Sequence, residues 1–341
     1  MTAGGIKSSA VIFLRRKCLY PGRPRAASPT AFSILISQDL TYILKYAIIA
    51  TIYGRKEIAM IEIIKSIILG IVEGITEWLP ISSTGHLILV DEFLKLKQSE
   101  DFKKMFDVVI QLGAIMAVVV IFWHKLWPFG KKENNAPLSD KGFGAYIKKD
   151  IFQMWFKVLA ACIPAAVVGL LFDDWIDEHF YNPWTVAVAL IVFGIAFIIV
   201  ENWNKGRSPK VTDISQLTYK AAFIIGMFQL IAAVFPGTSR SGATIVGALM
   251  IGISRTVAAE FTFYLAVPVM FGASLLKLAK FGLDFSGTEL AVLAAGMITA
   301  FVVSLFVIKF LMGYIKKHDF KVFGWYRIVL GALVILYFAI K

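Results

Sequence analysis

The sequence predicts an all-α polytopic membrane protein built as an inverted repeat, in which each half is a re-entrant helix hairpin plus three transmembrane helices. Three observations predict this fold: the composition, six regular apolar runs, and two interrupted apolar stretches that resemble each other. Of the 341 residues, 58% are hydrophobic and only 17% are charged. Soluble domains carry about 25% charged and at most about 50% apolar residues. The composition therefore excludes a soluble enzyme, a disordered protein and a coiled coil.

The net charge of +12 does not indicate a nucleic-acid partner. The basic residues lie between long apolar runs, as the positive-inside rule requires of a membrane protein. The two cysteines, Cys18 and Cys162, predict neither a disulfide framework nor a metal cluster. The expected surroundings are therefore membrane lipids.

Residues 1–59 form a basic N-terminal extension with nine Lys/Arg and two acidic residues. Its apolar stretch, 31–53, is interrupted by polar residues and makes a poor spanning helix. Three interpretations compete: a targeting segment, an extra helix, or translated upstream sequence with the true start near Met60. We favour the last, because everything interpretable begins at Met60.

Six apolar runs after Met60 are each long enough to cross roughly 30 Å of hydrocarbon. Tryptophans lie near their ends, where an aromatic belt would place them. The predicted crossings are 106–127, 155–172, 184–203, 261–280, 290–312 and 323–340.

Two further apolar stretches, 61–90 and 221–251, are broken near the middle by proline and small polar residues. Non-helical backbone at membrane depth is tolerated only inside protein or against a water-filled cavity. Both stretches are therefore interpreted as re-entrant hairpins that do not cross.

Loop charges support this topology. Basic loops predicted to be cytoplasmic are 124–150, 203–220 and 312–322. Loops predicted to be external are 91–105, in which four lysines balance four acids, and the acidic segments 173–183 and 281–289. One crossing between 220 and 281 then suffices, so the second broken stretch cannot cross as well.

The two broken stretches also match each other at a constant offset of 156 residues. The offset joins Gly70 to Gly226, Glu73 to Gln229 and Pro80 to Pro236. Three crossings follow each stretch, and an odd number inverts the second repeat relative to the first. The predicted repeats are 60–215 and 216–341, with the two hairpin tips meeting near the midplane.

Glu73 and Glu77 are four residues apart, so they share one face of a helix. Carboxylates inside an apolar run are costly and usually functional. The alternative is one interfacial glutamate or a structural ion pair. Two close carboxylates favour a divalent cation, a shared proton or a basic partner.

The first tip carries Ser82, Ser83, Thr84, Gly85 and His86. A polar turn that caps the next half-helix would explain such a run. However, His86 is the only one of the four histidines inside an apolar segment. A hydroxyl three residues from a histidine can be a nucleophile with its base, or the histidine can protonate a leaving group.

The second tip offers small residues, three hydroxyls and one arginine: Gly237, Thr238, Ser239, Arg240, Ser241 and Gly242. A half-helix N-terminus is an anion site, and arginine adds a bidentate fork for phosphate. The alternative is a lone arginine that caps a helix or pairs with lipid phosphate. Together the two tips would supply the groups that phosphoryl transfer needs.

Two other functions share part of this pattern. Broken helices in inverted repeats are also the plan of transporters, so a transporter or flippase of an anionic lipid is the alternative function. Another class of membrane lipid phosphatase needs a further histidine and aspartate after its arginine. The only histidine after Arg240 is His318, in a predicted cytoplasmic loop, which argues against that class.

Residues 73–86 and 236–242 resemble the two signature regions of the bacterial undecaprenyl-diphosphate phosphatases, the bacitracin-resistance family. The resemblance extends from Met60 to the C-terminus and includes 106–113. It implies a multi-pass enzyme of the bacterial plasma membrane that hydrolyses undecaprenyl diphosphate to undecaprenyl phosphate and recycles the cell-wall carrier lipid. It also implies bacitracin resistance, an outward-facing active site, a divalent cation (Mg²⁺ or Ca²⁺) and homodimers.

The resemblance also assigns roles by position. Glu73 and Glu77 match the family's acidic pair and would hold the metal, and Ser83 matches its proposed nucleophile. His86 matches the motif histidine, and Arg240 matches the phosphate-binding arginine. The remaining tip residues are expected to bind substrate: Ser82, Thr84, Gly85, Gly237, Thr238, Ser239, Ser241 and Gly242.

Overall fold

The computed structural model describes residues 57–341 except 131–133, 135 and 283. Residues 59–341 form one compact unit, and the structural statements below concern that unit. The proposed extension at 1–59 falls almost entirely outside the described residues, and so do the alternatives for it.

The described part of the chain is helical and contains no strand beyond isolated bridges such as Phe129 with Ile147. Six of its helices are long and apolar enough to cross a membrane, which confirms the predicted polytopic all-α class. These helices are α4 (Glu100–Ile121), α6 (Lys149–Phe180), α7 (Pro183–Asn204), α10 (Arg255–Phe281), α11 (Gly287–Tyr314) and α12 (Lys321–Ile340). The short elements between them are α5 (Trp123–Leu126), η1 (Gly142–Tyr146) and η2 (Ile214–Gln216).

The predicted external loop at 173–183 is wrong in its extent. Helix α6 continues to Phe180, and only Tyr181 and Asn182 separate it from α7. The side chain of Asn182 caps α7, accepting from the Thr185 N–H at 3.0 Å, with Pro183 at the first turn. Hydropathy detects where an apolar run ends, whereas a helix can continue beyond that run into polar sequence.

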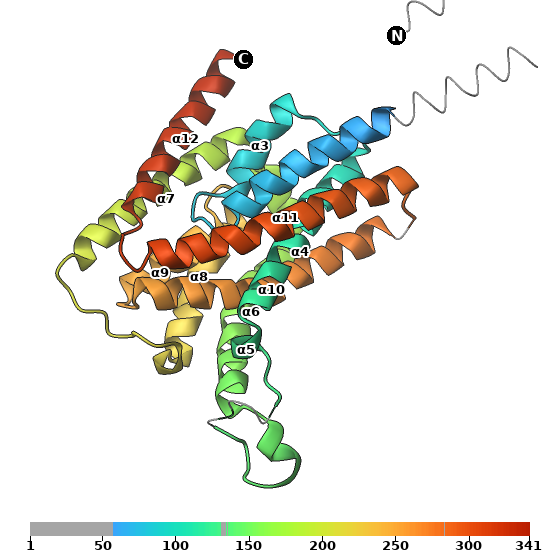
Figure 1. Cartoon of the computed structure of the whole chain (residues 1–341). Coiled ribbons are helices and arrows are strands. Elements are labelled where there is room, and N and C mark those ends of the chain that lie inside the picture. The colour runs from blue at the N-terminus through green and yellow to red at the C-terminus, as the bar shows by residue number, and fades with distance from the viewer. Residues whose placement is uncertain (1–56, 131–133, 135, 283) are drawn as a thin grey trace, which may run out of the picture. The chain divides into compact units, whose positions relative to one another are not determined.

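Both broken stretches form a helix, a turn and a second helix, as predicted (Figure 1). The first consists of a helix over residues 57–76 followed by α3 (Ser83–Phe93), and the second of α8 (Tyr219–Val234) followed by α9 (Arg240–Met250). Helices α3 and α9 each have 11 residues. At 1.5 Å per residue each is about 16 Å long, roughly half the hydrocarbon thickness.

In the structure, the two tips correspond at an offset that is one residue larger than the predicted offset of 156 residues. Ser82 caps α3 and Ser239 caps α9, so Ser82 corresponds to Ser239 and not to Thr238. The turn before α9 is therefore one residue longer than the sequence alignment implied. The inverted relation between the halves stays a prediction.

The helices pack in pairs that surround the tips. Helix α12 lies along α7, α11 along α4, and α8 along α6 (Figure 1). Close approach depends on glycine at Gly113, where a Cβ would lie 2.1 Å from the carbonyl oxygen of Met297 in α11. The tips are thus held inside protein, where irregular backbone can be tolerated.

Candidate active site

The two hairpin tips meet through an ion pair. Arg240 Nη2 donates to Glu77 Oε1 at 2.9 Å, and both side chains are nearly buried. The two residues are 163 positions apart in the chain. This contact places the acidic tip and the basic tip in one site, as the sequence predicted.

Glu77 is the centre of this site. Ser83 Oγ donates to Glu77 Oε2 at 2.8 Å, so the two carboxylate oxygens receive a hydroxyl and a guanidinium. Ser241 Oγ donates to the backbone carbonyl oxygen of Glu77 at 3.2 Å. A carboxylate that accepts from a serine hydroxyl can serve as its general base.

Two matching serines shape the tips. Ser82 and Ser239 have φ values of 75° and 68° and are the only described non-glycine residues with positive φ. Their hydroxyls accept from the N–H groups of Gly85 and Gly242 at 3.3 and 3.2 Å. Such backbone conformations cost about 1–3 kcal/mol and cluster at functional sites.

As a result, Ser83 and Arg240 are each the first residue of a half-helix. The free N–H groups and the dipole at a helix N-terminus favour an anion. Two such termini therefore lie beside the Glu77–Arg240 pair. This arrangement suits a ligand with more than one negative charge.

We expect Ser82→Ala to lower the midpoint of thermal unfolding, because it removes the cap and keeps the strained backbone. Ser82→Gly should cost less, since glycine adopts positive φ freely and is a tolerable cap. The free energies of unfolding of these two variants should differ by about 1 kcal/mol. Thermal unfolding of the two purified variants checks it, and equal midpoints would contradict a role for the strained cap.

Glu73 is fully buried, and neither of its carboxylate oxygens has a hydrogen-bond partner within the described residues. Glu77, Asp107 and Arg240 all act on it electrostatically. An isolated buried carboxylate is very costly. Glu73 therefore needs a proton or a cation.

The residues fit a divalent cation only in part. The described chain holds no group of three or more His, Cys, Asp or Glu placed for a metal. The unpartnered oxygens of Glu73 and the adjacent Glu77 provide two carboxylates. Mg²⁺ is commonly bound by one or two carboxylates together with substrate phosphates, so the site fits a metal that arrives with its substrate.

His86 lies on α3 but does not bond to Ser83 in the described structure. Its Nδ1 lies 2.7 Å from the Ser82 carbonyl oxygen, and its Nε2 lies 2.7 Å from the hydroxyl of Tyr326. Because a carbonyl only accepts, Nδ1 carries a proton, and the Tyr326 hydroxyl is the hydrogen-bond partner of Nε2. His86 thus joins the first tip to α12.

Arg327, which is not among the predicted site residues, is fully buried and contacts both tips. Its Nη1 donates to Pro80 O at 3.2 Å, and its Nη2 donates to Gly237 O and Thr238 O at 3.0 and 2.6 Å. No carboxylate pairs with it among the described residues. The sequence did contain a signal for Arg327, because an arginine inside an apolar crossing is a functional candidate by default.

The remaining candidates of the second tip have mainly backbone roles. A Cβ on Gly237, where φ is 90°, would lie 2.6 Å from Val186 Cα, and one on Gly242 would lie 2.7 Å from Arg327 Nη1. The hydroxyl of Thr238 is buried and has no hydrogen-bond partner in the described chain.

On the first tip, Thr84 is half-buried, and the tight contact of Gly85 is with Leu190 in α7.

An apolar groove lies beside the second tip. Its volume is about 530 Å³, and Thr238, two residues before Arg240, is one of its lining residues. Its apolar lining residues come from α6, α7, α8 and the residue that follows α8, and include Phe180, Trp184, Val188, Val192, Phe193, Ile231 and Phe235. An apolar chain can lie here with a polar head at the tips.

Fold and site together define a polytopic membrane protein with a buried carboxylate–hydroxyl–guanidinium site, suited to a phosphorylated ligand with an apolar tail. Residues 66–333 match the family described as bacitracin resistance protein BacA. This chain belongs to that family.

This chain aligns with nearly the whole length of several relatives. It is 63% identical over 283 residues to the undecaprenyl-diphosphatase of Desulfitobacterium hafniense, covering 83% of this chain and 98% of the relative. It is 64% identical over 280 residues to undecaprenyl-diphosphatase 1 of Clostridium acetobutylicum, covering 82% and 98%. A third relative, the undecaprenyl-diphosphatase of Enterococcus faecalis, is 60% identical over 280 residues, with 82% and 98% covered.

Proposed function

We propose that this protein hydrolyses undecaprenyl diphosphate to undecaprenyl phosphate and phosphate. This reaction recycles the lipid carrier for cell-wall synthesis and confers bacitracin resistance. The observation that carries the proposal is the contact of Glu77 with both Ser83 and Arg240 where the tips meet. The names of the relatives agree with it.

The substrate would bind with its diphosphate at the tips and part of its isoprenoid chain in the apolar groove that Thr238 helps to line. Arg240 is the residue that would change partner on binding. Its Nη1 is held by the Thr262 carbonyl oxygen at 3.1 Å, whereas its Nη2 is bonded to Glu77. An incoming phosphate competes with Glu77 for Nη2 and forms a charge-assisted bond.

In the proposed reaction, Ser83 Oγ attacks the terminal phosphorus and gives its proton to Glu77. The new bond joins Ser83 Oγ to phosphorus, and the bond from phosphorus to the bridging oxygen breaks. Undecaprenyl phosphate leaves with that oxygen. Water then hydrolyses the serine phosphoester, with His86 as the candidate for proton exchange, and phosphate leaves. Arg240 and the helix N-termini stabilise the charge on the transferred group.

A single-turnover quench tests the covalent route. We expect a phosphoserine at Ser83, detected by mass spectrometry of the quenched protein, and none in Ser83→Ala. The absence of the phosphoserine from wild-type protein that still releases phosphate would favour direct attack by water.

We further propose that Glu73 and Glu77 hold a divalent cation, Mg²⁺ or Ca²⁺, together with the substrate diphosphate. When bound, the cation supplies charge neutralisation on the phosphate oxygens. The unpartnered carboxylate of Glu73 supports this assignment.

Chelation should therefore abolish phosphate release, and added Mg²⁺ or Ca²⁺ should restore it. Substrate binding measured with and without chelator gives a second readout, and it should weaken without the cation. Unchanged release after exhaustive chelation would contradict the assignment.

We place the protein in the bacterial plasma membrane with its site facing outward, and we propose a homodimer. The asymmetry of loop charge supports this orientation, since the 203–220 and 312–322 segments are basic. To test this orientation, single cysteines are introduced into these segments and exposed to a membrane-impermeant labelling reagent in intact cells.

The experiment that tests the proposed function is phosphate release from undecaprenyl diphosphate by purified protein in detergent. Broken helices at two tips would also suit a flippase of an anionic polyprenyl phosphate lipid. Transport needs two compartments and hydrolysis does not. Release at a rate proportional to protein concentration supports the enzyme, and substrate binding without release would favour the transporter.

A further inference from the structure

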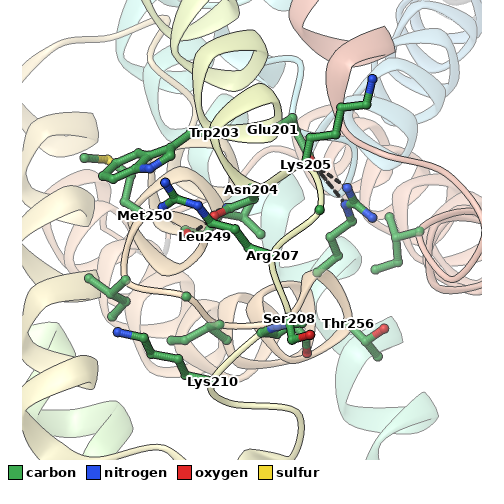
Figure 2. Close-up of a pocket in the computed structure, with 18 of the residues that line it drawn as sticks. Glu201, Trp203, Asn204, Lys205, Arg207, Ser208, Lys210, Leu249, Met250 and Thr256 are labelled. Atoms are coloured by element: carbon green, nitrogen blue, oxygen red, sulfur yellow. Dashed lines mark hydrogen bonds and ion pairs between the residues drawn. The ribbon is translucent and has the colours of Figure 1, made fainter.

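A second cavity lies away from the proposed active site. Its volume is about 880 Å³, and it lies between the loop that follows α7 and the turn that joins α9 to α10 (Figure 2). Helix α9 begins at Arg240 in the active site and ends at Met250 in this pocket. The two sites are therefore about one length of α9, roughly 16 Å, apart.

The pocket is strongly basic. It is lined by five cationic residues and one carboxylate: Lys205, Arg207, Lys210, Arg255, Lys316 and Glu201. Glu201 is already neutralised by Arg255, whose Nε and Nη2 donate to it at 2.9 and 2.5 Å. It also accepts from the backbone N–H of Phe320 at 3.0 Å.

The other four cations have no carboxylate partner within the described residues. The guanidinium of Arg207 instead lies over the ring of Trp203, 5.2 Å from its centroid, as Figure 2 shows. Stacking leaves the donor edge of a guanidinium available for an oxyanion. Four unpaired cations around one cavity are an electrostatic site for an anion.

The backbone of the pocket suits an oxyanion as well. Helix α10 begins here, with Ser254 as its cap, and its first N–H groups at Arg255 and Thr256 face no intrahelical acceptor. The loop is fixed in place, because Lys210 N donates to Gly252 O at 2.7 Å and Ser254 N to Val211 O at 2.9 Å.

One side of the pocket is apolar. Trp203 and Met250 line it and are about half exposed. Trp203 lies at the end of the apolar helix α7, where an aromatic side chain is expected near the headgroup region, and Met250 is the last residue of α9. An anion with an attached apolar chain would contact both sides.

We propose that this pocket, in the basic loop region expected to be cytoplasmic, binds a phosphate group. The group belongs to an anionic lipid of the leaflet on that side or to free phosphate. Lysine, arginine and helix N–H groups all recognise its oxygens. The apolar side of the pocket favours the lipid.

Binding of dioctanoyl phosphatidic acid to the purified full chain in detergent tests the proposal. The pocket variant is Lys205→Gln/Arg207→Gln/Lys210→Gln, whose three positions lie in an exposed loop. The matched control, Lys141→Gln/Lys149→Gln/Lys220→Gln, removes the same charge from exposed positions outside the pocket. We expect the pocket variant to bind at least tenfold more weakly and the control to bind as wild type does.

Inorganic phosphate and dioctanoyl phosphatidylcholine distinguish the sources. Loss of phosphatidic acid binding alone in the pocket variant identifies a lipid headgroup, and an equal loss of inorganic phosphate binding identifies a free anion. Equal binding by the pocket variant and the control, or binding of phosphatidylcholine as tightly as phosphatidic acid, would overturn the proposal. Phosphate release from undecaprenyl diphosphate should be unchanged in the pocket variant, so this test is separate from the proposed function.

Discussion

Glu77→Gln should reduce the rate of phosphate release from undecaprenyl diphosphate by about 10²–10³-fold, the usual effect of removing one preorganised catalytic group. The substitution keeps the shape of the side chain. It removes the negative charge that accepts from Ser83 and holds Arg240. An amide cannot take a proton from the serine hydroxyl, so the loss should appear in kcat.

A matched control is Glu92→Gln. Glu92 also lies on the first hairpin and pairs with Lys341 at 2.5 Å, but it lies outside the tips. We expect near wild-type release from this control. Retention of more than half of the activity by Glu77→Gln would remove Glu77 from the reaction.

Arg327→Met should lower both the thermal midpoint and the activity. Methionine fills similar space but leaves the carbonyl oxygens of Pro80, Gly237 and Thr238 without their donor. Each unsatisfied buried acceptor costs about 1–3 kcal/mol. Because these carbonyls belong to both tips, the tips should also separate or loosen, and KM should rise along with the loss of kcat.

Arg327→Lys separates charge from geometry. A lysine keeps the positive charge but cannot bond to both tips as a planar fork does, so we expect only partial recovery of the midpoint. Thermal unfolding and steady-state kinetics in the same detergent check both variants. A wild-type midpoint and activity in Arg327→Met would show that Arg327 does not hold the tips.

Much of the fold could be predicted because membrane burial leaves a direct mark on sequence. The six crossings are long apolar runs, and the two interruptions at proline and small polar residues became the two tips. Glu77 and Arg240 were also identifiable, since ionisable residues in apolar segments are rare. Their contact could be predicted because both tips were expected at the same depth in the membrane.

The other features of the site and fold could not be predicted, because they depend on tertiary packing. Arg327 lies in a predicted crossing, and only the folded chain shows that three tip carbonyls surround it. The partner of His86 is Tyr326, 240 residues away, which no local pattern indicates. Helix α6 extends to Phe180 because hydropathy does not detect a helix that leaves the apolar run.

The central claim is that the two hairpins form one catalytic site, and a double-mutant cycle tests it most directly. The measurement is kcat/KM for phosphate release by wild type, Glu77→Gln, Arg240→Ala and the double variant. Residues in direct contact are coupled, whereas independent residues have additive free-energy effects. We expect the double variant to be no more than about threefold slower than the slower single variant. A double variant whose loss equals the product of the two single losses would show that Glu77 and Arg240 act independently, and would contradict the single site.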